Sequence, residues 1–190
     1  MVSWDSLNSL NSHYKLDTML RSVHIYSNVS MRWTDAMSKI ESEAKMWTGA
    51  GKYDLYLLFH WLKMERGADK IGVKKVIEVV VNDGVNPGGR AYSQDGAEQL
   101  GHSDKVIVQC LKGLEVEVLD WRRADIPADR IVEAAGDSVK TLRLYCSGLQ
   151  AVLQSWADQK GLARLKELEK VHVEINQVRN GPHCMGVANR

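Results

Sequence analysis

Three residues of the types that form a nucleophilic triad occur in the order Asp83, His102 and Ser147. Each stands where an apolar stretch meets a turn or a helix start, which is where the catalytic groups of α/β enzymes gather. In such a triad the serine oxygen attacks a carbonyl, the histidine takes its proton and the aspartate orients the histidine. The order and placement therefore raise the hypothesis of acyl-transfer chemistry at the ends of strands.

The residues around the three argue against this chemistry. Subtilisin-like enzymes have an Asp-Ser/Thr-Gly turn, a His-Gly-Thr-His helix and a Gly-Thr-Ser-Met-Ala nucleophile turn, whereas this chain has NDGVN, GHSDK and CSGLQ. No asparagine stands in the context of an oxyanion hole, without which acyl transfer loses a large share of its rate enhancement. We interpret the three as a turn aspartate, a helix-entry histidine and a strand-end serine, and we predict no catalytic residue and no enzyme activity.

The loop NPGGRAYSQDGAEQLGHSD offers a second kind of chemistry, the binding of an anion. Gly88 and Gly89 can expose backbone N–H groups, Arg90 adds positive charge, and a helix begins after Ser103. The loop matches neither the phosphate-binding nor the dinucleotide-binding glycine pattern, so a surface insertion is the favoured interpretation. The alternative is a site for a nucleotide or another small phosphorylated ligand, formed by Asp83, Gly88, Gly89, Arg90, His102 and Ser103.

Histidine and cysteine do not form a metal-ligand pattern in this chain. His183 and Cys184 are adjacent, and adjacent residues rarely supply two ligands without others nearby. His24 and His172 occupy equivalent positions in two predicted strands, so we expect them to share one face of a sheet. We predict no metal site and no cofactor.

Tryptophan is abundant, with six residues beside a single phenylalanine. Trp47, Trp61 and Trp156 stand at core spacing on predicted helices. Trp121 is followed by Arg122 and Arg123, and tryptophan and arginine are the commonest anchors of protein interfaces. The segment DWRRAD is therefore the preferred protein-contact patch, and the alternative is the edge of the core.

The overall composition limits the class of partner. The 190 residues suit one domain with a substantial core, and 25 basic and 24 acidic side chains leave no excess charge for nucleic acid or an anionic membrane. The apolar run at 55–62 is too short to span a bilayer, and the first residues lack a secretory signal. The three cysteines (Cys110, Cys146 and Cys184) are expected to be reduced and mostly packed, which suits an intracellular, cytoplasmic protein.

Strands and helices alternate in the second part of the chain. A helix is predicted after Thr34, and the apolar segment at 53–67 predicts a buried helix that Gly67 stops. The apolar run at 75–82 is typical of a strand covered on both faces. A helix follows with Ser103 as its N-cap and Gly113 at its end, and another has Asp125 ahead of it, Pro127 in its first turn and Gly136 after it. Further strands are predicted at 116–121, 139–146 and 170–175, with a helix at 149–159 whose inward residues include Leu149.

The strands resemble one another at the positions of the leucine-rich repeat, L-x-x-L-x-L-x-x-N/C-x-L. The segments that begin at 20, 139 and 168 fit at the first three apolar positions, and a further match begins at 111. The starts at 111, 139 and 168 are 28 and 29 residues apart. The apolar positions of these matches are Leu20, Val23 and Ile25; Leu111, Leu114, Val116 and Trp121; Val139, Leu142, Leu144 and Leu149; and Leu168, Val171, Val173 and Val178.

These patterns predict an α/β fold, with a parallel sheet of about five strands, right-handed crossovers and N-terminal helices. The favoured arrangement is a short stack like that of leucine-rich repeats, and the alternative is a Rossmann-like open sheet of three layers. We predict a single domain over 1–178, with an N-terminal strand and helices in 1–70 and βα units in 74–178, and a flexible tail at 179–190.

The segment at 59–175 resembles a more specific group of proteins. The matching stretches are HWLK with GVKKVIEVVV, then HSDKVI, VEVLDWRRADI, LRLYCSGLQAVLQSW and GLARLKELEKVHVEI, in this order. They are similar to the region that precedes the protease domain in fungal intracellular subtilisin-like proteins. The chain departs from that pattern at Leu149 and Gln150, where the group has paired asparagines, and in the inserted glycine-rich loop.

The resemblance implies a non-catalytic module that stands beside a protease or another effector domain, and it supplies no catalytic residues. Together with the composition, it favours a non-enzymatic protein-interaction or regulatory module that binds a protein partner. The alternative function is an enzyme or sensor that binds a small molecule or nucleotide through the loop between Gly84 and Ser103.

Overall fold

The computed structural model describes residues 16–25, 54–65, 72–83 and 101–175, together with 2–3, 6–7, 9–10, 31–32 and isolated positions between 38 and 46. Most of the helix predicted after Thr34 lies outside these residues. The glycine-rich loop with Gly88, Gly89 and Arg90 also lies outside them, as does the tail.

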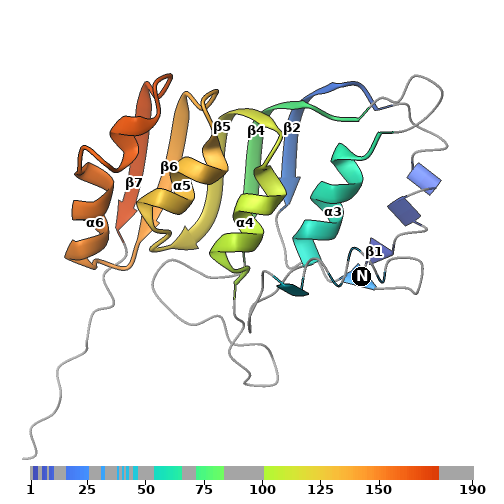
Figure 1. The fold of residues 1–190 in the computed structure, drawn as a ribbon, viewed down its shortest axis with the longest axis horizontal. Helices are drawn as coiled ribbons and strands as arrows, with labels where there is room; N and C mark the ends of the chain where they lie inside the picture. Colours follow the sequence, from blue (N-terminus) through green and yellow to red (C-terminus); the bar gives the residue numbers. More distant parts are fainter. Residues whose placement is uncertain are drawn as a thin grey trace, which may run out of the picture.

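Five parallel strands form one sheet in the order β2-β4-β5-β6-β7, without any reversal (Figure 1). This confirms the predicted α/β fold with a five-stranded parallel sheet. The strands are β2 (Met19–Ile25), β4 (Lys75–Asn82), β5 (Glu115–Ala124), β6 (Thr141–Cys146) and β7 (Lys170–Ile175). Two short segments, β1 (Val2–Ser3) and β3 (Met31–Arg32), pair separately in parallel.

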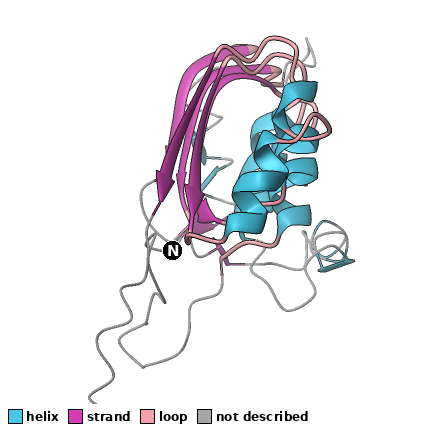
Figure 2. Ribbon diagram, turned by 90° about the vertical axis from the view of Figure 1, so that its left-hand side faces the viewer, coloured by secondary structure: helices cyan, strands magenta, loops and turns pink. Residues whose placement is uncertain are grey.

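The helices in the described residues cover one face of this sheet, so the fold has two layers (Figure 2). They are α3 (Asp54–Lys63), α4 (Asp104–Leu111), α5 (Ala128–Ala135), α6 (Gln150–Ala157) and the short 3₁₀ helix η2 (Leu162–Arg164). A steady strand order with helices on one side is the arrangement of stacked repeats, and it differs from the three-layer Rossmann-like alternative. The expectation that β4 is covered on both faces is wrong, because no described helix lies on the open face.

The predicted repeat positions lie in rows that cross the sheet and point toward the helices. One row contains Val23, Val79, Leu119, Leu142 and Val171. The matches that begin at 20, 139 and 168 therefore have the predicted register. The match that begins at 111 is wrong by five residues, because Val116, rather than Leu111, lies in the row of Leu20 and Val76.

Several predicted helix boundaries are confirmed by their caps. The Ser103 hydroxyl accepts a hydrogen bond from the backbone N–H of Val106 at 3.3 Å, and Gly113 and Gly136 follow α4 and α5 with positive φ angles of 81° and 65°. Pro127 is the N-cap of α5, one position before the helix. Asp125 lies farther away in a left-handed conformation, and its carboxylate accepts the N–H of Ser147 at 3.0 Å.

The core forms between the sheet and the helix layer. Leu57 and Phe59 of α3 are fully buried, and α3 buries residues on several sides as predicted. Trp61 and Trp156 are buried, and the indole N–H of Trp156 donates to the carbonyl of Ile126 at 2.9 Å. Leu149 is 57% exposed at the start of α6, so its predicted inward position is wrong. Cys110 and Cys146 are buried free thiols, and burial raises the pKa of Cys110.

Lys63 connects the end of α3 to the end of α4, and we predict that its ammonium group stabilises this junction. Its Nζ donates to the carbonyl oxygens of Gln109 at 2.8 Å and of Lys112 at 3.0 Å, where the dipole of α4 is negative. Replacing Lys63 with methionine keeps the aliphatic stem but leaves these carbonyls without their donor. We expect the free energy of unfolding, measured with denaturant, to fall by about 1–2 kcal/mol.

The matched control is Lys105→Met, which removes an exposed cation from the first turn of the same helix. A cation near a helix N-terminus is not stabilising, so this variant should unfold like the wild type. An equal loss in both variants would show that the contacts of Lys63 have no special role.

Candidate functional site

Asp83 and His102, which the sequence grouped only in the alternative ligand site, form a buried polar cluster with Trp121. Asp83 follows the end of β4, and its Oδ1 lies 2.5 Å from Nδ1 of His102. Both carboxylate oxygens also lie 3.1 Å from the backbone nitrogen of His102, and the indole N–H of Trp121 donates to Oδ2 at 3.0 Å. Asp83, His102 and Trp121 are 3%, 5% and 2% exposed.

The second ring nitrogen of His102 has a partner within the fold. The backbone N–H of Leu55, in the first turn of α3, donates to Nε2 of His102 at 3.2 Å. An Nε2 that accepts this bond carries no proton, so Nδ1 carries the proton and donates it to Asp83. Asp83 and His102 are therefore arranged like the aspartate and histidine of a catalytic triad. In a triad, however, Nε2 accepts the proton of the nucleophile, whereas here Nε2 accepts the N–H of Leu55 at the start of α3.

Ser147 lies in another part of the sheet, directly after β6. Its backbone N–H donates to the carboxylate of Asp125, and its chain position is two strands beyond that of Asp83 in the sheet order. The structure thus brings together Asp83 and His102 and leaves Ser147 elsewhere. This arrangement supports the interpretation of the three residues as elements of the fold.

The charge of Asp83 is stabilised by its surroundings. Burial opposes ionisation, but hydrogen bonds from the His102 ring, the Trp121 indole and the His102 backbone outweigh it, so the pKa of Asp83 lies below its usual value. By accepting these hydrogen bonds, the Asp83 carboxylate holds three segments together: the end of β4, the entry to α4 and, through His102, the start of α3.

The predicted contact patch of Trp121, Arg122 and Arg123 is divided between different parts of the molecule. The ring of Trp121 lies in the core, with its centre 6.0 Å from that of Phe59, so Trp121 is not available as a surface anchor. Arg123 forms an ion pair with Asp104 at 2.8 Å and donates to the carbonyl of His102. Only Arg122 reaches the open face, because neighbouring residues of a strand alternate between its two faces.

The open face of the sheet has its own polar cluster, centred on Asp120. Asp120 is 1% exposed, and it accepts a hydrogen bond from the Tyr145 hydroxyl at 2.7 Å. Arg122 Nη2 lies 3.3 Å from Oδ2 of Asp120, and Arg143 Nη1 lies 3.9 Å from the same oxygen. The two arginine side chains are 39% and 50% exposed. The cluster therefore offers outward-facing guanidinium groups that a buried carboxylate orients.

The pairing of β5 with β6 is irregular beside this cluster. The register between β5 and β6 shifts between Asp120 and Ala124, so that Tyr145 pairs with Ala124. Four residue steps of β5 thus correspond to two of β6, and extra residues in one strand bend it and re-aim its side chains. Burial and the hydrogen bond to Asp120 raise the pKa of Tyr145 to about 12. The phenol therefore stays protonated near neutral pH and acts as a donor rather than as a base.

A hollow of about 360 Å³ adjoins the cluster between β6 and β7. Its lining residues are Arg143, Leu144, Tyr145, His172, Val173 and Glu174. His172 and His24 lie in one row across the sheet, together with Val80, Asp120 and Arg143, which confirms that the two histidines share a face. We define Arg122, Arg143, Tyr145 and His172, grouped around Asp120, as the open-face cluster.

Charged side chains of both signs continue across the open face. Glu117 of β5 lies 2.7 Å from Lys75 and 3.0 Å from Lys140, and these pairs lower the pKa of Glu117 and raise that of Lys75. Farther along, Nε2 of His24 lies 3.1 Å from the carboxylate of Glu78. Charges of both signs therefore alternate along this part of the surface.

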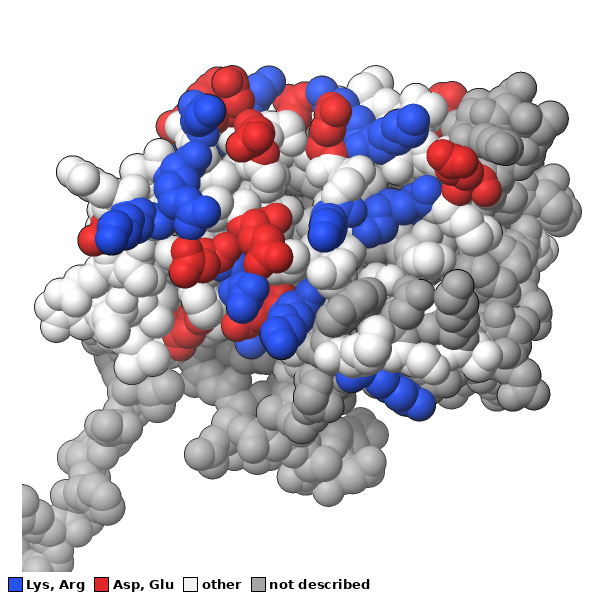
Figure 3. All heavy atoms as spheres, viewed as in Figure 1, with Lys and Arg blue, Asp and Glu red and all other residues white. Residues whose placement is uncertain are grey.

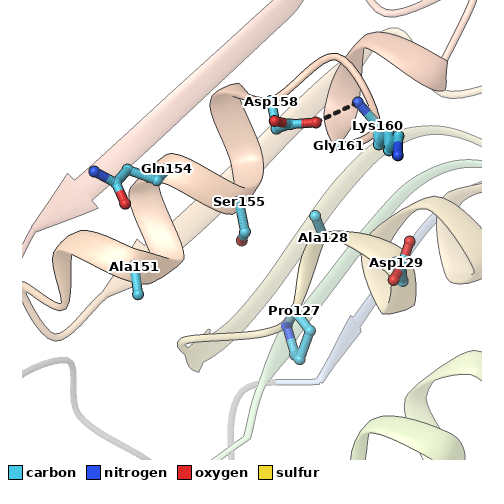
Figure 4. Close-up of a pocket in the computed structure, with 9 residues that line it drawn as sticks. All are labelled: Pro127, Ala128, Asp129, Ala151, Gln154, Ser155, Asp158, Lys160 and Gly161. Carbon is cyan, nitrogen blue, oxygen red and sulfur yellow. Dashed lines mark hydrogen bonds between the residues drawn. The ribbon is translucent and has the colours of Figure 1, made fainter.

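The described part of the helix face shows no comparable grouping. Lysine and arginine are intermingled with aspartate and glutamate on its described part, as in the pairs Arg130–Glu133 at 2.7 Å and Arg164–Asp129 at 2.8 Å (Figure 3). A groove of about 420 Å³ runs between the start of α5 and α6 (Figure 4). Its polar groups are used locally: Ser155 donates to the carbonyl of Val152, and Asp158 accepts the N–H of Lys160.

The sequence did not indicate Arg143 or Tyr145 as site residues, and it included Asp120 only as the first residue of DWRRAD. The sequence signal of Asp120 and Arg143 is a charged residue between apolar neighbours in a predicted strand, as in LDW and LRL. Such a residue faces away from the helix layer, but its partners on the next strand follow from register, which a single strand does not reveal.

Comparison with known protein families, with curated proteins and with solved structures found no match. Among the residues that the structure describes, no group of three histidine, cysteine, aspartate or glutamate side chains is placed to hold a metal ion. The described helices are also too short or too polar to cross a membrane.

Proposed function

We propose that this chain is a non-catalytic interaction module that binds a protein partner across the open face of its parallel sheet. The observation that carries the proposal is the open-face cluster, in which a buried carboxylate orients exposed arginines and a tyrosine beside a hollow. Arginine and tyrosine are enriched among the residues that dominate protein interfaces. Side chains that are already oriented lose little conformational freedom on binding.

The two-layer arrangement supports the same proposal. Every second side chain of a strand points away from the helices. Because the helices cover only one face of the sheet, these side chains form a continuous surface on the other face. The resemblance to the region ahead of fungal subtilisin-like protease domains supports a regulatory role beside an effector domain. A cytoplasmic setting for this role remains part of the proposal.

The small-molecule alternative receives less support from the described residues. Of its six residues, the structure describes Asp83, His102 and Ser103, and all three are used to connect β4, α3 and α4. If the alternative were correct, ATP or NAD would raise the melting temperature of the protein by linkage. We expect no change with either compound.

The open-face proposal predicts that Arg143→Ala prevents partner binding. The side chain of Arg143 is half exposed at the centre of the cluster, and it has the longest contact with Asp120, so its removal should leave the fold intact. In quantitative affinity capture with extract of the source cells, we expect recovery of the bound partner to fall about tenfold or more.

The matched control is Arg164→Ala. Arg164 is equally exposed, at 50%, and also pairs with an aspartate, but it lies beside the helix layer. This variant should capture the partner as the wild type does. Equal capture by the Arg143 and Arg164 variants, or the same loss in both, would contradict binding through the open face.

A further inference from the structure

The last strand of the sheet, β7, has an edge that no described strand covers (Figure 1). All six of its residues are exposed. Val171, Val173 and Ile175 are 39%, 44% and 48% exposed, although Leu142 and Leu144 in the same rows are 0% and 5% exposed. An apolar strand with an available edge is a template for pairing with another strand.

The side chains of β7 are complementary to those of a second copy of the same strand. Val171, Val173 and Ile175 point to the helix side, whereas Lys170, His172 and Glu174 point to the open side. If two copies run antiparallel about a two-fold axis at His172, Val171 lies opposite Val173 of the second copy. Lys170 then lies opposite Glu174 of the second copy, and both pairs occur twice because of the symmetry.

Other registers fit less well. A shift by one residue places valines opposite charged residues and joins opposite faces of the two sheets. A two-fold axis at Val173 brings Val171 opposite Ile175 and His172 opposite Glu174, but it brings no residue of β7 opposite Lys170. An axis at Val171 brings Lys170 opposite His172. Of these registers, the axis at His172 is the one that places valine opposite valine and lysine opposite glutamate.

We propose that two copies of this chain associate through β7, antiparallel about a two-fold axis at His172, to form one continuous sheet. In this dimer the two helix layers lie on the same side, and the two open faces join into one surface. The exposed valines of each β7 are covered by those of the other copy. The inference stands apart from the proposed function, because it is carried by the exposed valines and by Lys170 and Glu174 of β7, whereas the proposed function is tested at Arg143; His172 belongs to both regions.

The test measures self-association of the purified full chain by sedimentation velocity over a range of concentrations. The wild type should sediment as a dimer that dissociates on dilution. Lys170→Glu and Glu174→Lys should each raise the dissociation constant about tenfold, because each places like charges opposite one another twice. The double variant Lys170→Glu with Glu174→Lys should restore the wild-type value, because it exchanges the charges of both partners.

Lys166→Glu is the control, since it reverses an exposed charge in the turn before β7 and should leave the dissociation constant unchanged. All these residues are exposed, and circular dichroism checks that each variant folds. A monomer at every concentration would overturn the proposal and leave the edge to a strand of another chain. A dimer that the single reversals do not weaken, or that the double variant does not restore, would overturn it as well. Arg143→Ala should not change the dimer, which keeps this test separate from that of partner binding.

Discussion

Replacing Asp83 with asparagine is expected to lower the free energy of unfolding by about 3–5 kcal/mol. The Asp83 carboxylate accepts hydrogen bonds from the His102 ring, the His102 backbone and the Trp121 indole, and it is almost completely buried. An asparagine of the same shape has only one acceptor oxygen, so its amide group must face a donor. A buried donor without an acceptor costs its full desolvation energy. Urea unfolding followed by circular dichroism measures the loss.

Two further variants distinguish the cluster from a general effect of mutation. Trp121→Phe removes one donor but retains an aromatic ring beside Phe59, and we expect it to cost about 1–2 kcal/mol. Asp129→Asn changes an 82% exposed carboxylate on the helix face and should leave stability unchanged. If Asp83→Asn were as stable as Asp129→Asn, Asp83 would not hold the three segments together.

The pKa of Asp83 also predicts how this loss depends on pH. Because the pKa is lower in the folded protein than the ordinary value of 3.8, the charged carboxylate stabilises the fold above that value. The stabilisation disappears as the pH falls below 3.8 and passes through the folded pKa. The difference in unfolding free energy between the wild type and Asp83→Asn should therefore be constant near neutral pH and become smaller in acid. A difference that grows in acid would contradict this assignment.

Replacing Gly161 with alanine is expected to lower the free energy of unfolding by about 3 kcal/mol. Gly161 is buried in the loop that follows α6, beside the last turn of that helix (Figure 4). A Cβ atom there would overlap with the carbonyl oxygen of Ser155, and it would lie 2.9 Å from that of Trp156 and 3.0 Å from that of Asp158. These are backbone atoms, so the end of α6 must move, together with the buried Trp156 that it positions. Denaturant unfolding measures the effect.

Gly136→Ala is the matched control for Gly161→Ala. Gly136 has a positive φ angle of 65°, and a Cβ atom there would meet no other atom within 4 Å. Its ψ angle is −167°, so its replacement should cost only this backbone conformation, which L-residues rarely adopt, about 1–3 kcal/mol. Gly161 does not have a positive φ angle, with φ at −89°, so the comparison separates steric overlap from backbone conformation. Equal losses in the two variants would exclude overlap at Gly161 as the main cause.

Local signals in the sequence predicted the elements of the fold and the order in which they occur. The apolar positions around Val139 and Leu168 correctly predicted two strands and the direction in which their side chains point. Ser103, Gly113 and Gly136 correctly predicted helix boundaries. These predictions succeeded because burial periodicity and capping depend on residues only a few positions apart.

The register of β5 required the tertiary structure. The sequence template fitted Leu111 and Leu114 as well as it fitted other strands, but the neighbouring strand β4 pairs with residues five positions farther on. That shift places Trp121 in the core and turns Arg122 and Arg123 away from one another. A single strand contains no information about which residue of its neighbour it meets, because that choice follows from packing across the whole sheet.

The sequence by itself therefore determined an alternation of parallel strands and helices, and it placed Asp83 in a turn after a strand and His102 at the entry to a helix. Only the tertiary structure decided that His102 holds the start of α3 rather than a nucleophile. It also decided that Asp120 gathers Arg122, Arg143 and Tyr145 on the open face. The physical reason is that periodic apolar residues act locally, whereas a polar cluster needs strands that are distant in the chain to meet in one register.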